Sequence, residues 1–447
     1  MPASGKRTRR TLARKRGSSS RALLTVFAFS TLLAVSIEFA GAALPTTLAE
    51  LNDWYSEPPA GQNGAALVLQ GANLLKVSPT DRTSNIPWIG SAKAQPLDKP
   101  QPPALSKAIA DFLRVNQAAF FYLRRAADQD LSRYPVDFTK GLDIDMLHLK
   151  KAQEASRYLA VLALYEASRS QSSKAAEPLL ANFGLAKSLE AEPCLISQRV
   201  RGLIVIRAFE ALEQTLNRVS LTSDSLSKLQ NLLQKAERQE LDGLGLFRGI
   251  VGDRLSMGTL FDLPPDKAEG ILDDIFKQMR LQENLSVTAI HYSGTADKDF
   301  TEAFYGRVLD LCKKAHSARS HLIIEECLRQ QAIAKEKGLV IGYLNSFRIA
   351  HAVTAEVQTL ACLRLAGIAV ALERYRVAAG RYPETLSQLQ LPSGDADTPA
   401  PDTTQELDYK KSSKGYVISC VSSELPKGSS GLSFRIVTAG SVGGVRP

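Results

Sequence analysis

The sequence predicts a mainly α-helical protein with three parts: an N-terminal transmembrane helix, a body that is a helical-hairpin bundle or an irregular α-solenoid, and a small C-terminal α+β module with an antiparallel sheet. Three observations lead to this prediction. Residues 22–44 are almost entirely apolar, apolar residues recur at helical spacing over most of the chain, and the composition changes to Gly, Ser, Pro and Thr after Leu391. With 447 residues, 44% hydrophobic and 23% charged, the chain is neither disordered nor collagen-like.

The N-terminus holds the topology signal. Residues 22–44 contain a single acid, Glu38, and as a helix they would span about 34 Å, which is enough to cross a bilayer. By the positive-inside rule, the basic tail at 1–21 stays in the cytoplasm and the rest of the chain is exported. We therefore expect a single-pass protein of the bacterial cytoplasmic (inner) membrane, with the bulk of the chain extracytoplasmic. The tail holds eight basic residues and no acid: Lys6, Arg7, Arg9, Arg10, Arg14, Lys15, Arg16 and Arg21.

The N-terminal region could be cleaved after export. Ala40-Gly41-Ala42 has the small-x-small form that a signal peptidase accepts, so a cleaved signal peptide is the alternative to a signal anchor. Both versions export the body.

The basic tail lacks aromatic residues and adjoins the span, so we expect it to contact anionic lipid and not nucleic acid. Of the 55 basic residues, 47 follow the tail, against 46 acidic residues, so the body is almost neutral.

Residues 45–104 are expected to form a membrane-proximal segment with a proline-rich loop. Residues 48–75 have the pattern of short helices interrupted at Pro58-Pro59, with Asn63 placed to begin an apolar helix. Residues 79–103 hold six prolines, which remove backbone donors and break helical periodicity. We expect a surface loop there, held against the core by Trp88.

The helical body is expected over residues 105–345. Thr222, Ser223 and Asp224 offer N-cap oxygens, and Pro193 bars the preceding helix from continuing. In the run that begins at Leu195, a buried stripe is predicted from Ile196, Val200, Leu203, Ile204, Ala208, Leu212 and Leu216. The helical runs are Leu105–Ala127, Met146–Ser168, Ala175–Leu189, Leu195–Leu216 and Ser225–Gln239, a weaker stretch to Arg280, and helices between Thr301 and Leu328.

Residues 346–447 are expected to form a long helix followed by a small β module. The helix is predicted over Phe347–Ala379, where Arg364 in the middle argues against a second membrane span. A hairpin turn is predicted at Ser412–Gly415. The β-type runs are Glu406–Lys410, Tyr416–Val421 and Ser433–Val437.

The junction between this helix and the β module has a distinctive sequence. Gly380 is placed to end the helix in a left-handed conformation, Tyr382 to cover the helix end, and Pro383 to prevent the helix from resuming. This junction resembles that of the bacterial type II secretion pseudopilins, over roughly the last 85 residues. The resemblance implies a helix-plus-sheet fold. Two features depart from it: more than 300 residues separate the apolar span from the junction, and the acidic residues of a pseudopilin calcium site are missing, so calcium is not predicted.

The whole chain is also similar to a group of uncharacterised bacterial membrane-anchored α-helical proteins with such a C-terminal module. The similarity involves Arg133-Tyr134-Pro135 with Asp137 and Gly141, then the run Glu192-Pro193-Cys194-Leu195-Ile196-Ser197, which opens a helix ending in Leu212-Glu213. The group has no assigned activity, so the resemblance implies a membrane-anchored helical architecture and no catalytic residues.

One cluster has the residue types of a metal site, namely Cys312, His316, His321 and Cys327. Cys312 and His316 are four residues apart, so on one helix they share a face, and a turn at Ser317–Ser320 would bring the other two alongside. No His-Glu-x-x-His or paired Cys-x-x-Cys motif is present, so no metal is assigned. Ordinary buried thiols and a disulfide between Cys312 and Cys327 are the alternatives.

The functional expectation follows from what the sequence contains. It has no Walker loop, nucleophile elbow or recognisable triad, so the catalytic residues are unknown, no cofactor is predicted and a non-enzyme is favoured. We expect a membrane-anchored extracytoplasmic helical scaffold or protein-interaction protein whose partners are other envelope proteins. The first alternative is a metal-dependent hydrolase that uses the Cys312/His316/His321/Cys327 region. The second is an accessory component of a type II secretion-like assembly.

Overall fold

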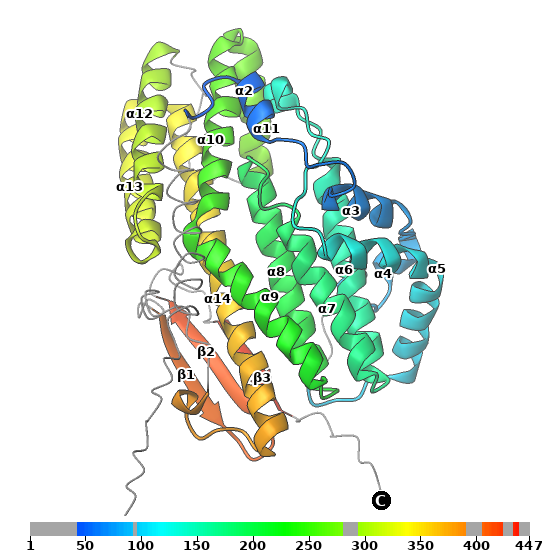
Figure 1. Ribbon diagram of the computed structural model, residues 1–447. Helices are drawn as coiled ribbons and strands as arrows, with labels where there is room; N and C mark the ends of the chain where they lie inside the picture. Colours follow the sequence, from blue (N-terminus) through cyan, green and yellow to red (C-terminus); the bar gives the residue numbers. More distant parts are fainter. Residues whose placement is uncertain (1–42, 93–95, 280–293, 390–404, 423–431, 438–447) are drawn as a thin grey trace, which may run out of the picture. The chain divides into compact units, whose positions relative to one another are not determined.

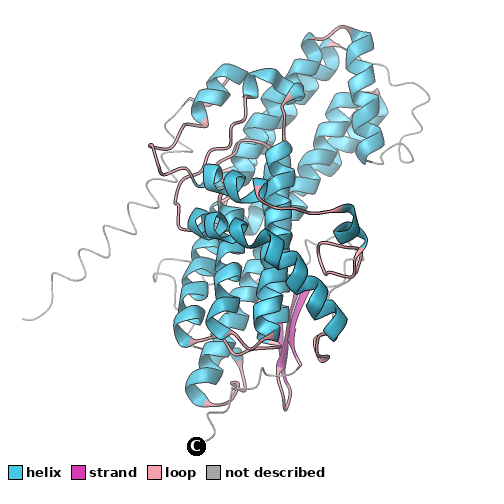
Figure 2. Ribbon diagram, turned by 90° about the vertical axis from the view of Figure 1, so that its right-hand side faces the viewer, coloured by secondary structure: helices cyan, strands magenta, loops and turns pink. Residues whose placement is uncertain are grey.

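Helices dominate the computed structural model, which describes residues 43–92, 96–279, 294–389, 405–422 and 432–437 (Figures 1 and 2). The prediction of a mainly helical fold with a small C-terminal antiparallel sheet is confirmed. The described residues from Leu44 onward belong to one compact unit. The predicted membrane span at 22–44 and the basic tail at 1–21 lie outside the described residues, apart from Ala43 and Leu44.

Three short helices precede the helical body: α2 (Leu48–Trp54), α3 (Gly64–Asn73) and α4 (Pro79–Thr83). As predicted, the first two are separated at the Pro58-Pro59 pair, and the Asn63 side chain caps α3 by accepting from the Ala65 N–H. Helix α4 lies where only loop is predicted. It forms because Ser78 and Asp81 make a reciprocal capping box and Pro79 occupies the first turn, where its missing N–H costs nothing.

Trp88 holds the proline-rich loop against the helical body, as predicted, but through a polar contact. Its indole Nε1 donates to Glu210 Oε2 of helix α8 (Leu195–Leu216) over 2.9 Å. The side chain is only half-buried, so it lies on the surface of α8 and not in the core.

Between Leu105 and Gln239 the helices of the body follow the predicted runs to within three residues at each end, with α8 matching its run residue for residue. The last two helices of the body extend beyond the predicted Thr301–Leu328, since they begin at Thr295 and end at Lys337. The stripe predicted on α8 is wrong at two of its seven positions, because Ile196 and Leu203 are 48% and 47% exposed. Helix α8 packs against α6, α7 and α14, and these two residues, one heptad apart, fall on the face left open. The elements are α5 (Pro103–Ala127), η1 (Phe138–Asp143), α6 (Leu147–Ser168), α7 (Ser172–Lys187), α8, α9 (Ser223–Asp242), α10 (Leu244–Gly258), η2 (Thr259–Asp262), α11 (Pro265–Met279), α12 (Thr295–Cys312), α13 (His316–Lys337) and α14 (Val340–Ala379).

Helix α14 is the longest described helix and packs against α8, α9, α12 and α13. It begins at Val340, earlier than predicted, because the buried Asp297 of α12 caps its first turn: its two carboxylate oxygens accept from the Ile341 and Gly342 N–H groups over 2.9 Å each. Among the described residues, α14 is the one helix long and apolar enough to cross a membrane. In its most apolar stretch 83% of the residues are buried inside the protein, as in a core helix.

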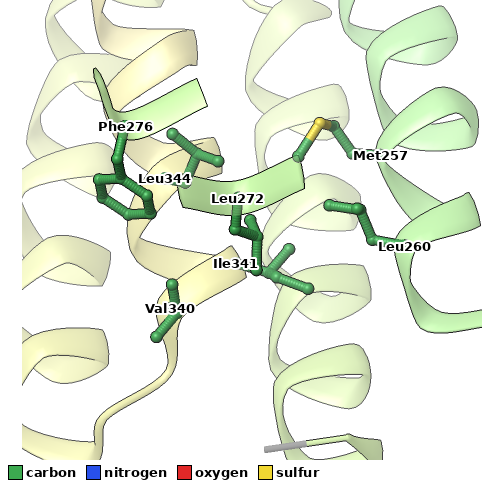
Figure 3. Packing of buried hydrophobic residues seen from close by; sticks show 7 residues of the cluster. All are labelled: Met257, Leu260, Leu272, Phe276, Val340, Ile341 and Leu344. Carbon is green, nitrogen blue, oxygen red and sulfur yellow. The ribbon is translucent and has the colours of Figure 1, made fainter. Parts of the chain in front are cut away.

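The N-terminal end of α14 takes part in a tight apolar cluster with α10, η2 and α11. Figure 3 shows the side chains of this cluster gathered between the four elements. Because they come from segments far apart in the sequence, their contacts hold the weakly predicted α11 to the rest of the body. The members are Met257, Leu260, Leu272, Phe276, Val340, Ile341 and Leu344.

The C-terminal sheet has three antiparallel strands in the order β1 (Gln405–Lys411), β2 (Tyr416–Ser422) and β3 (Leu432–Ile436). Asp408 pairs with Ser419, and Ile418 pairs with Phe434. The predicted turn at Ser412–Gly415 is confirmed, since the Ser412 N–H donates to the Gly415 carbonyl over 2.9 Å. Figure 1 shows the sheet beside the C-terminal part of α14.

The sheet is attached to the helical body through β3. Phe434 is fully buried and its ring meets that of Phe209 of α8, with centroids 5.3 Å apart. Asn217 and Glu213 satisfy the edge of β3: the Asn217 amide donates to the Arg435 carbonyl and accepts from the Val437 N–H, and Glu213 accepts from the Arg435 N–H. These bonds cover an edge that would otherwise be open to pairing with another strand.

Candidate functional site

The four predicted metal ligands do not form a ligand set. Cys312 ends α12, and the chain turns at Lys313–Ala315, so His316 already belongs to α13 together with His321 and Cys327. The prediction of a shared face for Cys312 and His316, with a turn at Ser317–Ser320, is therefore wrong. Within the described parts of the chain, no three His, Cys, Asp or Glu side chains are grouped as a metal site requires.

The cysteines are free thiols. All five lie in the described residues and none forms a disulfide, so the predicted alternative of a Cys312–Cys327 bridge is not seen. Burial raises the pKa of the Cys312 thiol to about 12 and that of Cys194 to about 11. Thiols with such pKa values are neutral and weakly nucleophilic at physiological pH. They pack as small apolar side chains, which is the ordinary alternative given above.

A buried ion-pair network lies where α13 meets α9 and α14. Arg319 is 1% exposed, and its Nη2 donates to Glu356 Oε1 over 3.0 Å and to the Glu240 carbonyl over 3.2 Å. Its Nη1 donates to the Leu241 carbonyl over 3.2 Å. The Glu240 carboxylate in turn pairs with Arg201 of α8. We call this set of Arg319, Glu356, Glu240, Leu241 and Arg201 the Arg319 network; it connects four helices through the guanidinium groups of Arg319 and Arg201.

His316 lies beside the Arg319 network, and the network helps to determine its protonation state. Arg319 Nη2 lies 3.1 Å from His316 Nδ1, which therefore acts as an acceptor. Burial, together with the charges of Arg319 and Arg364, lowers the pKa of His316 to about 4. Burial raises the pKa of Glu356 to about 7, against the opposing effect of Arg319. The structure thus places a neutral histidine and a weakly acidic carboxyl on the same arginine.

These two shifts predict opposite pH dependences of stability. The pKa of His316 is lowered on folding, so its contribution to the free energy of unfolding rises with pH between about 4 and 6.5. The pKa of Glu356 is raised on folding, so its contribution falls as pH rises from about 4.5 to 7. Between about pH 4.5 and 6.5 the two contributions therefore offset each other.

Single substitutions are expected to separate the two contributions. His316→Asn is expected to lower the free energy of unfolding, relative to wild type, by about 1 to 2 kcal/mol more at pH 6.5 than at pH 4.5. For Glu356→Gln the difference has the same size and the opposite sign, so the larger loss is expected at pH 4.5. Urea unfolding of the full-length protein at several pH values measures both slopes. Parallel profiles for wild type and both variants would show that neither group changes its pKa on folding.

A second buried polar network joins the segments on which the family resemblance rests. Glu192, fully buried between α7 and α8, accepts from the Ser197 hydroxyl over 2.5 Å and lies 2.9 and 3.1 Å from His148 Nε2 through its two oxygens. The Tyr55 hydroxyl reaches the same carboxylate at 3.5 Å and accepts from the Tyr134 N–H over 2.9 Å. We call these five residues the Glu192 network.

Aromatic contacts reinforce the Glu192 network. The Tyr134 ring packs on the His148 ring with centroids 4.6 Å apart, and the Tyr134 hydroxyl is 2.7 Å from Ser188 Oγ. Arg133 lies over the Tyr55 ring at 5.2 Å. Burial raises the pKa of both tyrosines, so they remain protonated hydrogen-bond donors. Sequence reasoning missed His148 and Tyr55, because neither lies in a recognisable motif and each acts through a distant partner.

The junction residues Gly380, Tyr382 and Pro383 adopt the predicted geometry. Gly380 has φ 72°, and its N–H donates to the Arg376 carbonyl over 2.8 Å, which ends α14. Tyr382 is 6% exposed and its hydroxyl donates to Glu373 Oε1 over 2.6 Å. The Pro383 carbonyl accepts from the Tyr409 hydroxyl of β1 over 2.9 Å, which ties the junction to the sheet.

Comparison with protein-family models, with curated proteins and with solved structures gives no match for this chain. The fold and the two networks therefore define the chain in structural terms: a mainly helical protein whose buried polar side chains connect its helices. In both networks buried carboxylates are bonded to buried side chains of other segments, an arrangement suited to holding helices in place.

Proposed function

We propose that the protein is a membrane-anchored, extracytoplasmic helical scaffold of the bacterial cell envelope that binds other envelope proteins. Residues 22–44 anchor it in the cytoplasmic membrane, and the basic tail rests on anionic lipid of the inner leaflet. We infer further that the helical body is a bundle and not an open solenoid, because α14 contacts helices from both halves of the body.

One observation supports the scaffold proposal above all others. Glu213 of α8 and Asn217 at its C-terminal end bond directly to the backbone of β3 and of the residue after it, so the C-terminal sheet is fixed to the helical body. A protein that holds partners in a defined relation needs its binding surfaces on one framework, and these bonds supply that connection. The two buried networks also join helices distant in sequence and so help to hold this framework together.

Cysteine labelling tests the membrane topology. Lys410 is exposed on β1, and Ser4 lies in the basic tail. In spheroplasts, a membrane-impermeant maleimide is expected to label Lys410→Cys at once and Ser4→Cys only after lysis. The unsubstituted protein is the control, because its thiols have raised pKa values and are largely buried. Equal labelling of the two positions before lysis, or of neither, would contradict the anchored, exported arrangement.

An accessory role in a type II secretion-like assembly is the second candidate, favoured by the observed order of long helix, Gly380 junction and antiparallel sheet. Photo-crosslinking residues at Leu407 on β1 and at Val115 on α5, both exposed, distinguish the two roles in intact cells. Adducts with pseudopilins at Leu407 alone favour the secretion role. Adducts with other envelope proteins favour the general scaffold, and an absence of adducts at both positions would count against each.

A further inference from the structure

A cavity of about 550 Å³ lies where the N-terminal end of α5 meets the C-terminal ends of α6 and α8. This volume is in the range of small-molecule sites in proteins. Three of its lining residues are cationic, Lys107, Arg169 and Arg218, and none is acidic. The cavity is therefore lined by positive charge that its own wall does not neutralise.

Arg218 is the cation of this cavity whose buried nitrogens lack partners among the described residues. Its Nη1 donates to the Gln214 carbonyl over 2.7 Å, at the C-terminal end of α8. Its Nε and Nη2 are buried and have no hydrogen-bond partner among the described residues. Burial lowers the pKa of Arg218, and no acidic side chain in the described part of the chain offsets this effect. A desolvated guanidinium with two nitrogens that have no acceptor is costly for the folded protein unless a ligand supplies one.

Gln101 is the second lining residue with unsatisfied polar atoms. Both its Oε1 and its Nε2 are buried without a partner among the described residues. A buried amide of this kind costs about 1 to 3 kcal/mol for each unmade hydrogen bond. Two residues that line the cavity thus hold buried, unused groups: donors on Arg218, and a donor and an acceptor on Gln101.

The geometry of the unused groups indicates the ligand chemistry. Nε and Nη2 form one edge of the guanidinium plane, and this edge matches the two oxygens of a carboxylate. The Gln101 oxygen requires an N–H or O–H donor next to that carboxylate. Pro100, Ala110 and the Tyr165 ring supply apolar surface for a short carbon skeleton.

We propose that this cavity binds a carboxylate that has a neighbouring N–H or O–H donor, with Arg218 as the bidentate partner and Gln101 as the second contact. The carboxylate can come from a small organic acid or from the C-terminus of a peptide. Arg169 lies over the Tyr165 ring at 5.2 Å and adds positive charge at the cavity wall. Lys107 already pairs with Asp111 over 3.0 Å and contributes less.

Calorimetry and thermal unfolding of the detergent-solubilised full-length protein test this proposal. The probes are N-acetyl-L-alanine, which has a carboxylate next to an N–H group, and N-acetyl-L-alanine amide, which lacks the charge. We expect the acid to bind and to raise the midpoint of unfolding, and the amide to do neither. An acetylated tripeptide with a free C-terminus, compared with its amidated form, distinguishes a peptide source from a small acid.

Two variants identify the residues. Arg218→Gln is expected to weaken binding of the acid about 10- to 100-fold. Arg207→Gln is the matched control: Arg207 lies on α8, the helix that Arg218 follows, burial likewise lowers its pKa, and its Nη1 likewise has no partner among the described residues, but it does not line the cavity. We expect wild-type affinity for that control, and a smaller loss for Gln101→Leu, which tests the site independently should Arg218→Gln fold poorly. Equal binding of acid and amide, unchanged affinity in both cavity variants, or tighter binding of inorganic phosphate would overturn the assignment.

Discussion

Replacing Gly243 with alanine is expected to lower the free energy of unfolding by about 4 kcal/mol, whereas the same change at Gly338 is expected to cost about 1 kcal/mol. Both glycines follow a helix in the left-handed conformation, with φ 70° and 68°. A Cβ at Gly243 would lie 2.1 Å from Arg319 Nη1 and 2.2 Å from its Cζ, whereas a Cβ at Gly338 would meet nothing within 4 Å. The left-handed strain is therefore shared by both variants, and only the first displaces the buried guanidinium.

The cost arises because Arg319 has little room to move. Its charge is buried against Glu356 and against the carbonyls of Glu240 and Leu241, and a displaced buried ion pair loses about 3 to 5 kcal/mol. Chemical denaturation of the two glycine variants gives the comparison. If Gly243→Ala and Gly338→Ala lose the same amount, close approach of Arg319 to the backbone has no energetic importance. In an Arg319→Ala background, Gly243→Ala should lower the free energy of unfolding only by the cost of the left-handed backbone conformation.

Local chemistry accounts for the parts of the fold that could be predicted from the sequence. Asn63, Thr222 and Gly380 act on backbone groups within four residues of themselves, so their capping roles follow from residue type and position. The long periodic runs were recognisable for the same reason, since each helix displays its own buried face. The turn at Lys313–Ala315 was missed because this short polar segment contains neither Gly nor Pro, and His316 continues the helical pattern.

The two networks could not be predicted in this way. Arg319 meets Glu356 across 37 residues of sequence, and His148 meets Glu192 across 44, so only the packing of the helices brings each pair together. Spacing along one helix pointed instead to Cys312 and His316, which the structure places on two different helices. The open face of α8 has the same explanation: periodicity identifies an apolar stripe but does not show which of its residues the neighbouring helices cover, and Ile196 and Leu203 are left exposed.

Replacing Glu192 with alanine is expected to lower the free energy of unfolding by about 4 kcal/mol. The substitution removes a fully buried carboxylate that accepts from Ser197, contacts His148 and reaches Tyr55. All three partners stay buried without an acceptor, and each unmade hydrogen bond adds about 1 to 3 kcal/mol of its own. Because these partners lie at the C-terminal end of α2, on α6 and on α8, the loss is expected to loosen the contact among the three helices.

A double-mutant cycle with Ser197→Ala separates this loss of partners from the general cost of a cavity. Alone, Ser197→Ala is expected to lower the free energy of unfolding by about 1 to 2 kcal/mol, because the hydrogen bond from the Ser197 hydroxyl to the charged Glu192 carboxylate is lost. In the Glu192→Ala background the same change should cost almost nothing, since the hydroxyl has already lost its acceptor. If the losses of unfolding free energy for Glu192→Ala and Ser197→Ala are strictly additive, the carboxylate stabilises the fold by filling space. A coupling of about 1 kcal/mol or more would show that the motif beginning at Glu192 stabilises the fold through its hydrogen bonds.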